Sequence, residues 1–110
     1  MQELIEAKFS IGNIVKHKFL KFRGVIFDLD PTFNNTEDWY NAIPEKFRPK
    51  KDQPFYHLFA ENEEIFYIAY VSEQNLLDDL SSGPANHPDI KLIFSHFDGK
   101  CYVPHRKTKN

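Results

Sequence analysis

The sequence contains little cysteine, little glycine and no long apolar run. Its single cysteine, Cys101, excludes a disulfide within the chain and favours a reducing compartment. The apolar runs are far too short to cross a bilayer, and the N-terminal stretch 1-MQELIEAKF lacks the apolar region of a secretory signal. These absences predict a cytoplasmic protein with no membrane partner.

A large excess of charge is also missing. The formal net charge is -2 at pH 7 and the pI is about 6.2. Proteins that bind nucleic acid through their overall electrostatic field are usually basic, so only a local basic patch is left for that purpose. Basic patches occur at 46-KFRPKK and 105-HRKTK, whereas 61-ENEE and 78-DD are acidic.

Aromatic residues, by contrast, are abundant. The 110 residues include Phe 11 times, Tyr five times and Trp once. This composition indicates a small core that is filled by a few large side chains. At this length we expect one domain, residues 1–110.

Two pairs of strands are predicted. The stretch 13-NIVKHKFLKFRGVIFDLD predicts two strands with a break near Lys21, and Gly24 indicates a bulge or bend. Asp30-Pro31 ends the second strand, because proline cannot donate to a ladder. The stretch 53-QPFYHLFAENEEIFYIAYVSEQNL predicts two more strands around the hinge 61-ENEE. Both are apolar on both faces, which indicates cover on each side by the same chain or by another copy.

The connection between these pairs predicts a short helix. Thr36 is suited to cap it, and the acidic residues 37 and 38 lie in its favourable first turn. Trp39 and Ile43 fall on one face of this helix, and Pro44 limits its length.

Two later segments have helical patterns. The polar run 72-SEQN ends the sheet and can start a helix that buries Leu76, Leu77 and Leu80 on one side. Further on, the spacing of apolar residues favours a helix, with a hairpin about 98-DG as the competing interpretation. That helical stripe consists of Ile90, Ile93, Phe94 and Phe97.

Catalytic and metal-binding patterns are weak. None of the short zinc spacings, phosphate loops or nucleophile motifs occurs, so we expect no enzyme, no cofactor and no metal. Cys101 with His96 or His105 could form a thiol nucleophile, but a small apolar filler is the simpler interpretation. A metal site could form only if four residues of the predicted sheet converge, namely His17, Asp28, Asp30 and His57.

Basic residues offer the best candidate site. Several could contact phosphates, although each could equally be a solvated surface charge. Trp39 and Tyr40 are the aromatic residues least clearly assigned to the core, and they could stack on bases. The candidate DNA-binding residues are Lys16, Lys18, Arg23, Arg48, Lys50 and Lys51. The candidate oligomer-interface residues, on the two-sided apolar hairpin, are Phe66, Ile68 and Tyr70.

An ordered series of blocks carries a family resemblance. The blocks are 11-IGNIVKHKF, 22-FRGVIFDLDP, 38-DWY, 48-RPKKDQPFYHLFAEN and 70-YVSEQNL, followed by 87-HP. This series closely resembles the HspQ family, also called the YccV-like or hemimethylated-DNA-binding domain. The resemblance covers about residues 9–103 and leaves a basic tail at 104–110. The long blocks are most similar to the alphaproteobacterial branch.

The resemblance implies a mainly β fold, a small and strongly bent SH3-like β-barrel with short helical additions. It implies a non-enzymatic bacterial regulatory protein of the cytoplasm that binds DNA, hemimethylated DNA in particular. The alternative role that it implies is a heat-shock module of the stress response, which enhances substrate degradation by the ATP-dependent Lon protease. Family members also form homo-oligomers, with a trimer as the expected state. The resemblance transfers no binding residues, so the candidates above come from this sequence alone.

Overall fold

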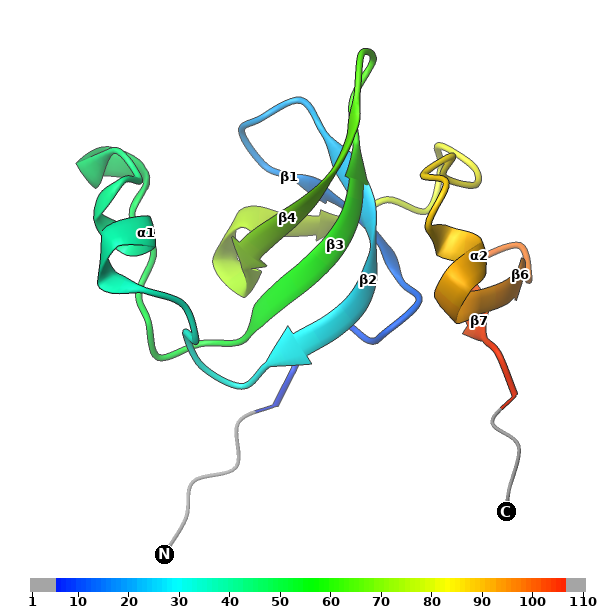
Figure 1. Cartoon of the computed structure of the whole chain (residues 1–110), viewed down its shortest axis with the longest axis horizontal. Helices are drawn as coiled ribbons and strands as arrows, with labels where there is room; N and C mark the ends of the chain where they lie inside the picture. The colour runs from blue at the N-terminus through cyan, green and yellow to red at the C-terminus, as the bar shows by residue number, and fades with distance from the viewer. Residues whose placement is uncertain (1–5, 107–110) are drawn as a thin grey trace, which may run out of the picture.

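The computed structural model describes residues 6–106. A five-stranded antiparallel sheet in the order β4-β3-β2-β1-β5 is accompanied by a two-stranded sheet of β6 and β7 (Figure 1). The strands are β1 Ile14–His17, β2 Arg23–Asp30, β3 Phe55–Glu61, β4 Phe66–Ser72, β5 Leu76–Asp78, β6 Phe94–Phe97 and β7 Tyr102–Pro104. The helices are α1 Glu37–Asn41 and α2 Ile90–Ile93, and the 3-10 turns are η1 Glu45–Phe47 and η2 Glu73–Asn75.

The mainly β prediction is confirmed, but the larger sheet is open. Its edge strands are β4 and β5, and no pairing within residues 6–106 joins them. The SH3-like barrel is therefore not confirmed. No helix in this part of the chain is long and apolar enough to span a membrane.

β1 and β2 form where the sequence predicts, and β2 ends at Asp30. The bulge predicted at Gly24 is misplaced, because Gly24 pairs regularly with Val15 and Ala60. The register shift lies instead between Ile26 and Asp28. Glycine is needed at position 24 because the β3 backbone lies close to it. A Cβ there would lie 2.7 Å from the carbonyl oxygen of Phe59.

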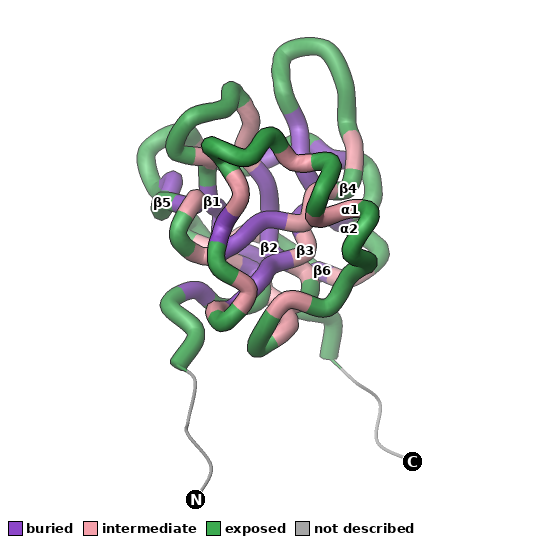
Figure 2. The backbone as a smooth tube through the Cα atoms, turned by 90° about the vertical axis from the view of Figure 1, so that its left-hand side faces the viewer, coloured by how far each residue is buried: buried purple, intermediate pink, exposed green. Residues whose placement is uncertain are grey.

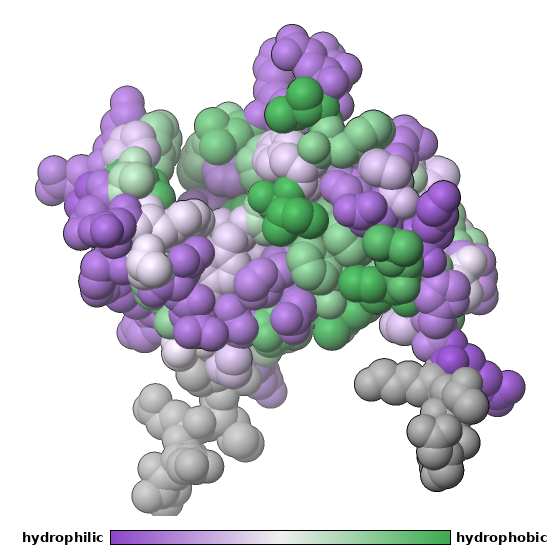
Figure 3. Space-filling model, viewed as in Figure 1, coloured by the Kyte–Doolittle hydropathy of each residue, from purple (hydrophilic) through white to green (hydrophobic). Residues whose placement is uncertain are grey.

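The predicted hairpin of β3 and β4 is confirmed, with pairing from Phe55↔Ser72 to Glu61↔Phe66. β3 is covered on both faces by the same chain, as predicted. β4 is an edge strand, and its Phe66 and Ile68 are 51% and 53% exposed. Cover of this face by another copy therefore stays a prediction. Figure 3, in the same view as Figure 1, shows apolar residues, in green, exposed over the middle of the molecule.

The polar run after β4 ends that strand, as predicted, but it forms only the 3-10 turn η2. The helix predicted to bury three leucines together is wrong. Leu76 is buried, whereas Leu77 and Leu80 are exposed. The reason is that residues 76–78 form β5 and pair with β1, and a strand turns successive side chains to opposite faces.

The helix favoured for residues 90–97 forms only over residues 90–93, and the competing hairpin is correct for the rest. α2 has four residues and stops at Ile93, and Phe94 begins β6. β6 pairs with β7 across the turn that contains Asp98 and Gly99. Gly99 takes a φ of 104°, which the turn requires and which glycine adopts without strain.

Residues 31–54 connect β2 to β3 and are called the arm. The arm carries α1 and stands apart from the strands on the left of Figure 1. The predicted cap of α1 is confirmed, since the Thr36 hydroxyl oxygen accepts the Trp39 N–H at 3.0 Å. The base of the arm is closed by a hydrogen bond from the Phe33 N–H to the Lys51 carbonyl oxygen at 2.9 Å.

Two clusters of buried side chains pack on the two faces of the larger sheet. Figure 2 shows the buried stretches gathered along the strands and the exposed ones in the loops. The alternation of neighbours between the clusters follows the period of a strand. One cluster contains Phe9, Val15, Ile26, Tyr56, Leu58, Ala60, Val71 and Leu76. The other contains Ile14, Val25, Phe59, Ala85, Ile90, Phe94 and Tyr102. The second cluster is where α2, β6 and β7 cover the sheet.

Candidate functional site

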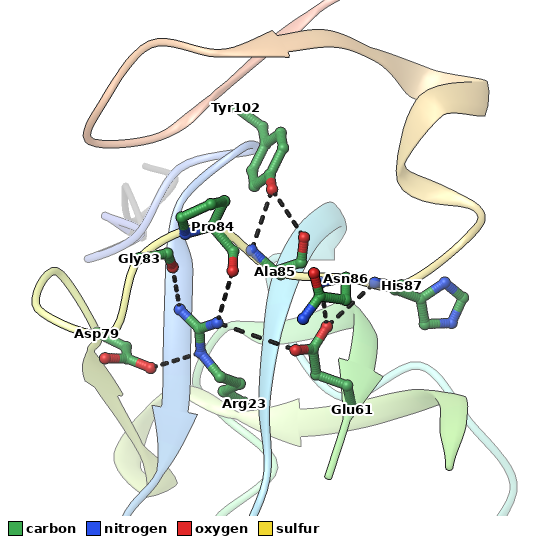
Figure 4. Close-up of polar contacts among 9 residues, drawn as sticks. All are labelled: Arg23, Glu61, Asp79, Gly83, Pro84, Ala85, Asn86, His87 and Tyr102. Atoms are coloured by element: carbon green, nitrogen blue, oxygen red, sulfur yellow. Dashed lines mark hydrogen bonds and ion pairs between the residues drawn. The ribbon is translucent and has the colours of Figure 1, made fainter. Parts of the chain in front are cut away.

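The six candidate DNA-binding cations are not equally available to a ligand. Arg23 is the least available of them, because it is surrounded by partners within the protein (Figure 4). Its Nε donates to Asp79 Oδ2 at 2.7 Å. Its other nitrogens donate to the carbonyl oxygens of Gly83 and Pro84, and Nη1 lies 3.9 Å from Glu61 Oε2. Only 17% of the Arg23 side chain is exposed. Its donors are directed into the protein rather than toward a surface.

The same cluster fastens residues 83–87 to the sheet. Glu61 Oε1 accepts the N–H groups of Asn86 at 2.6 Å and His87 at 3.1 Å. The Tyr102 hydroxyl accepts the Ala85 N–H at 3.0 Å and donates to the Ala85 carbonyl oxygen at 3.1 Å. The loop after β5 is thus held between the end of β3 and β7.

The charge state of Asp79 fits a structural ion pair. Burial raises the pKa of the Asp79 carboxyl, but its hydrogen bonds with Ser82 and Arg23 and the Arg23 charge outweigh burial, so the pKa lies below its usual value. Asp79 is therefore ionised at neutral pH, and Arg23 neutralises it.

Arg48 and Lys51 lie in the arm and make contacts within it. Arg48 Nε and Nη2 donate to the Ile43 carbonyl oxygen at 3.0 and 2.8 Å. Lys51 Nζ pairs with Glu37 and lies 4.5 Å from the centroid of the Tyr40 ring. These two cations hold α1 and η1 onto the rest of the arm.

The other three candidates, Lys16, Lys18 and Lys50, are exposed and are called the lysine surface. The Lys18 N–H donates to the Asn75 carbonyl oxygen at 2.9 Å, and the Lys50 N–H donates to Gln74 Oε1 at 3.4 Å. The η2 turn therefore brings the loop after β1 and the end of the arm together. Within residues 6–106 none of the three side chains forms an ion pair.

A groove of about 640 Å³ lies between the arm, the loop 18–22 and β4. Its walls are mostly apolar and aromatic. The groove is lined by Leu20 and Phe22 from the loop, Trp39, Ile43 and Phe47 from the arm, and Tyr67, Ala69, Tyr70 and Val71 from β4, among others. The sequence carries no local signal for this groove, because its three walls come from segments that are far apart in the chain.

The basic side chains that line the groove are His17 and Lys21. Among the described residues no carboxylate lines it. Burial lowers the pKa of His17, whose Nδ1 accepts the N–H groups of Phe19 and Leu20 at 3.0 Å each. Ser72 also lines the groove, and its hydroxyl is buried without a hydrogen-bond partner among the described residues.

The two uncertain aromatic residues have different positions. Trp39 lines the groove, and its ring lies 5.4 Å from that of Tyr70. The Tyr40 hydroxyl donates to the Pro49 carbonyl oxygen at 2.5 Å, and its ring lies under Lys51. Only Trp39 is therefore placed to meet a ligand.

The four residues of the possible metal site do not converge, and only His57 and Asp30 lie together. His57 Nε2 lies 3.0 Å from Asp30 Oδ2, which also accepts the Tyr70 hydroxyl at 2.9 Å. His17 lies in the groove, and Asp28 caps its own backbone by accepting the Leu29 N–H. Among the described residues no group of three or more His, Cys, Asp or Glu is arranged to hold a metal ion.

Cys101 is not activated as a nucleophile. Burial and the neighbouring Asp98 carboxylate raise the pKa of the thiol, whose Sγ lies 3.8 Å from Asp98 Oδ2. A reactive thiol needs the opposite shift.

The three candidate interface residues also differ from one another. Phe66 and Ile68 are exposed on the outer face of β4. Tyr70 is partly buried, and its hydroxyl accepts the Asn34 N–H at 2.9 Å. Tyr70 therefore fastens the arm to β4, and only the first two present a free apolar face.

The fold and the site define a small, mainly β domain with an exposed lysine surface and an apolar groove. Residues 7–101 match the family described as "Hemimethylated DNA-binding protein YccV like". The chain belongs to this YccV-like family, as the resemblance of its sequence blocks to the HspQ family predicted.

Three mammalian proteins carry a similar segment. The chain is 33% identical over 102 residues to F-box only protein 21 of Homo sapiens and of Pongo abelii, and 32% identical to that of Mus musculus. These matches cover 92% of this chain but only 16% of the length of each relative. No solved structure matches the chain.

Proposed function

We propose that this protein is a non-enzymatic DNA-binding regulatory domain. Membership of a family described as hemimethylated-DNA-binding supports the ligand class. The observation that carries the proposal is that Lys16, Lys18 and Lys50, the three residues of the lysine surface, are each exposed without an ion pair in the described part of the chain.

The three lysines act as phosphate contacts. Such contacts supply affinity and orientation, and they do not read base sequence. Because the formal net charge is -2, the local patch and not the overall field attracts the DNA. Arg48 and Lys51 act indirectly in this proposal, since they hold together the arm that carries Lys50. Arg23 contributes to the fold, since it fastens the loop after β5 to the sheet. The proposal also includes a bacterial origin, a cytoplasmic location and an SH3-like fold for this protein.

The test is binding of a labelled DNA duplex at two salt concentrations, in unmethylated, hemimethylated and fully methylated forms. The proposal expects binding that weakens as salt rises, because each phosphate contact releases counterions. Preference for the hemimethylated duplex would assign methylation readout to this domain. Absence of binding to all three duplexes at low salt would overturn the proposal.

A second candidate is a protein-interaction module of the stress response that enhances degradation by the Lon protease. The exposed Phe66 and Ile68 on an edge strand favour it, because such apolar edges commonly mark contact with another protein chain. A homo-oligomer, a trimer in particular, would use the same face. The degradation rate of a Lon substrate with and without this protein tests the role, and an unchanged rate counts against it.

A further inference from the structure

β4 is an edge strand without the usual protection. Natural edge strands carry lysine, proline or bulges that prevent another strand from pairing with them. The β4 sequence FYIAYVS contains no charged residue and no proline, and its pairing with β3 has no register shift. The strand is therefore competent to accept a further strand.

Hydrogen bonds at the two ends of the ladder show which backbone groups are free. The Asn62 N–H donates to the Ile65 carbonyl oxygen at 3.1 Å, and the Glu73 N–H donates to that of Pro54 at 2.9 Å. Antiparallel pairs alternate between hydrogen-bonded and non-hydrogen-bonded. With the observed register, the residues of β4 whose amide groups face β3 are Tyr67, Ala69 and Val71.

The amide groups of Phe66, Ile68 and Tyr70 consequently point away from β3, toward the free edge. No backbone hydrogen bond from this side of β4 occurs within residues 6–106. The arm lies beyond β4, but it contacts the strand through side chains, such as the rings of Trp39 and Tyr70. The edge is bare along the groove.

The groove beside this edge has the chemistry of a peptide site. Its walls offer aromatic and aliphatic side chains. Leu20 and Phe47, which line it, are 56% and 43% exposed, and the exposed Phe19 ring lies 6.5 Å from that of Phe47. A volume of about 640 Å³ accepts several side chains of an extended segment and is large for one base.

The charge of the groove favours a bound peptide segment that has an acidic residue at one end. Lys21 lines the groove, and no carboxylate within residues 6–106 does, so an acidic side chain is attracted and a basic one meets no opposite charge there. A nucleic acid would also be attracted by Lys21, but it cannot use the row of backbone donors and acceptors on β4 as a strand does.

We propose that the groove binds an extended apolar segment of a partner protein, which pairs with the free edge of β4 and places an acidic residue near Lys21. The inference deepens the second candidate function and rests on it only for the class of partner. Peptide binding needs no protease, so the two ideas can fail separately.

The experiment probes the full chain with an array of synthetic peptides. Each peptide is about ten residues long, because an extended strand of that length spans the groove. The strongest binder is then labelled and titrated in solution. We expect binders with alternating apolar residues and an Asp or Glu at one end. We also expect slower amide hydrogen exchange at residues 66, 68 and 70 in the complex.

Two pairs of variants separate the edge from its side chains. Ile68→Pro removes an amide that makes no bond to β3, and we expect about tenfold weaker binding from the lost hydrogen bond and the added ring. Ile68→Ala keeps that amide and should bind as the unmodified chain does. Lys21→Glu should weaken binding, whereas Lys100→Glu, in the β6–β7 turn on the side opposite α1, should not.

Three results would overturn the proposal. The first is a peptide array in which no peptide binds, and the second is unchanged amide hydrogen exchange at the β4 edge. The third is equal peptide binding by the Ile68→Pro and Ile68→Ala chains when both have the circular dichroism spectrum of the folded protein. Displacement of the peptide by a DNA oligonucleotide at similar concentration would assign the groove to nucleic acid. Loss of self-association in Ile68→Pro, without any peptide binding, would assign the edge to a second copy.

Discussion

Arg23 and Asp79 are 56 residues apart in the sequence, yet they form a hydrogen-bonded ion pair of 2.7 Å between β2 and the loop that follows β5. Their side chains are 17% and 3% exposed. Burial of this kind makes each charge depend on the other, because removing one partner leaves an uncompensated charge in the protein. Arg23 thus contributes to the fold, although its sequence position among lysines resembles that of a surface cation.

Replacement of Arg23 by Met should therefore lower the free energy of unfolding by about 3 kcal/mol. Denaturant unfolding at neutral pH measures the change. Lys18→Met, which changes an exposed lysine in the loop after β1, is the matched control and should alter stability little. Equal stability of the Arg23→Met and Lys18→Met chains would contradict the structural role of the pair.

The same pair predicts a dependence on acid. The pKa of Asp79 is lower in the folded chain than its ordinary value. The unfolded state therefore binds the proton more readily, and the stabilisation is present above the ordinary pKa and is lost as the pH falls through the folded one. Unfolding curves below about pH 4 should show this loss, and Asp79→Asn should flatten that part of the pH profile.

Tyr56 predicts the opposite dependence at high pH. Its hydroxyl accepts the Phe9 N–H at 3.1 Å and donates to Glu73 Oε2 at 2.8 Å. Burial, followed by the contact with Glu73, raises the pKa of Tyr56 to about 12. The folded state holds this proton more tightly than the unfolded state, so stability is intact below the unfolded pKa and decreases as the pH rises through the folded one.

Tyr56→Phe should reduce stability by about 1–2 kcal/mol at neutral pH, because the Phe9 N–H loses its acceptor in a buried place. The difference from the unmodified chain should shrink toward the alkaline end of the range. At neutral pH Tyr67→Phe is the control for the lost hydrogen bond, since the Tyr67 hydroxyl makes none within residues 6–106. A constant difference at all pH values would show that Tyr56 does not titrate as described.

Gly12 and Gly83 form a natural comparison of backbone strain. Gly12 has a φ of 96°, and a Cβ there would lie 2.1 Å from the Tyr102 carbonyl oxygen. Gly83 has a φ of 73°, with nothing within 4 Å of the same position. Gly83→Ala should cost about 1 kcal/mol for conformation alone, whereas Gly12→Ala should cost about 3 kcal/mol because the β7 backbone must also move. Equal thermal unfolding temperatures for the two variants would refute this.

Local signals in the sequence predicted the local structure well. Thr36 followed by two acidic residues predicted the start of α1, and the apolar runs around 61-ENEE predicted β3 and β4. The C-terminal error has a physical cause. Phe94 and Phe97 fit a helical stripe with Ile90, but Phe94 and Tyr102 pack in the cluster that covers the sheet, and this tertiary contact favours β6.

The candidate site was less predictable, because its properties depend on distant neighbours. Lysine and arginine look alike as cations in the sequence, whereas the carboxylates and carbonyl oxygens that engage Arg23 and Arg48 are visible only in the fold. The groove has the same origin. Leu20, Phe47 and Val71 meet only because the arm and the loop 18–22 approach β4.

Phe66 gives a direct test of self-association. Its side chain is 51% exposed on β4, and its ring lies 5.6 Å from the His87 ring in an edge-on arrangement. If another copy covers this face, Phe66→Lys should convert an oligomer to a monomer, because a buried unpaired charge is costly. Light scattering measures the mass. Leu92→Lys, which changes a 70% exposed residue of α2, is the control, and an oligomer that persists in Phe66→Lys would exclude the face.

The lysine surface predicts a particular salt dependence of DNA binding. Replacing Lys16, Lys18 and Lys50 together by Ala should lower affinity for every duplex sequence and reduce the slope of log affinity against log salt by about 1 per lysine. None of the three makes an ion pair within residues 6–106, so the fold should persist. The control chain carries Lys91→Ala in α2 and Lys100→Ala in the turn between β6 and β7. An unchanged slope in the triple variant, with a steep slope in the unmodified chain, would mean that the DNA lies on another part of the protein.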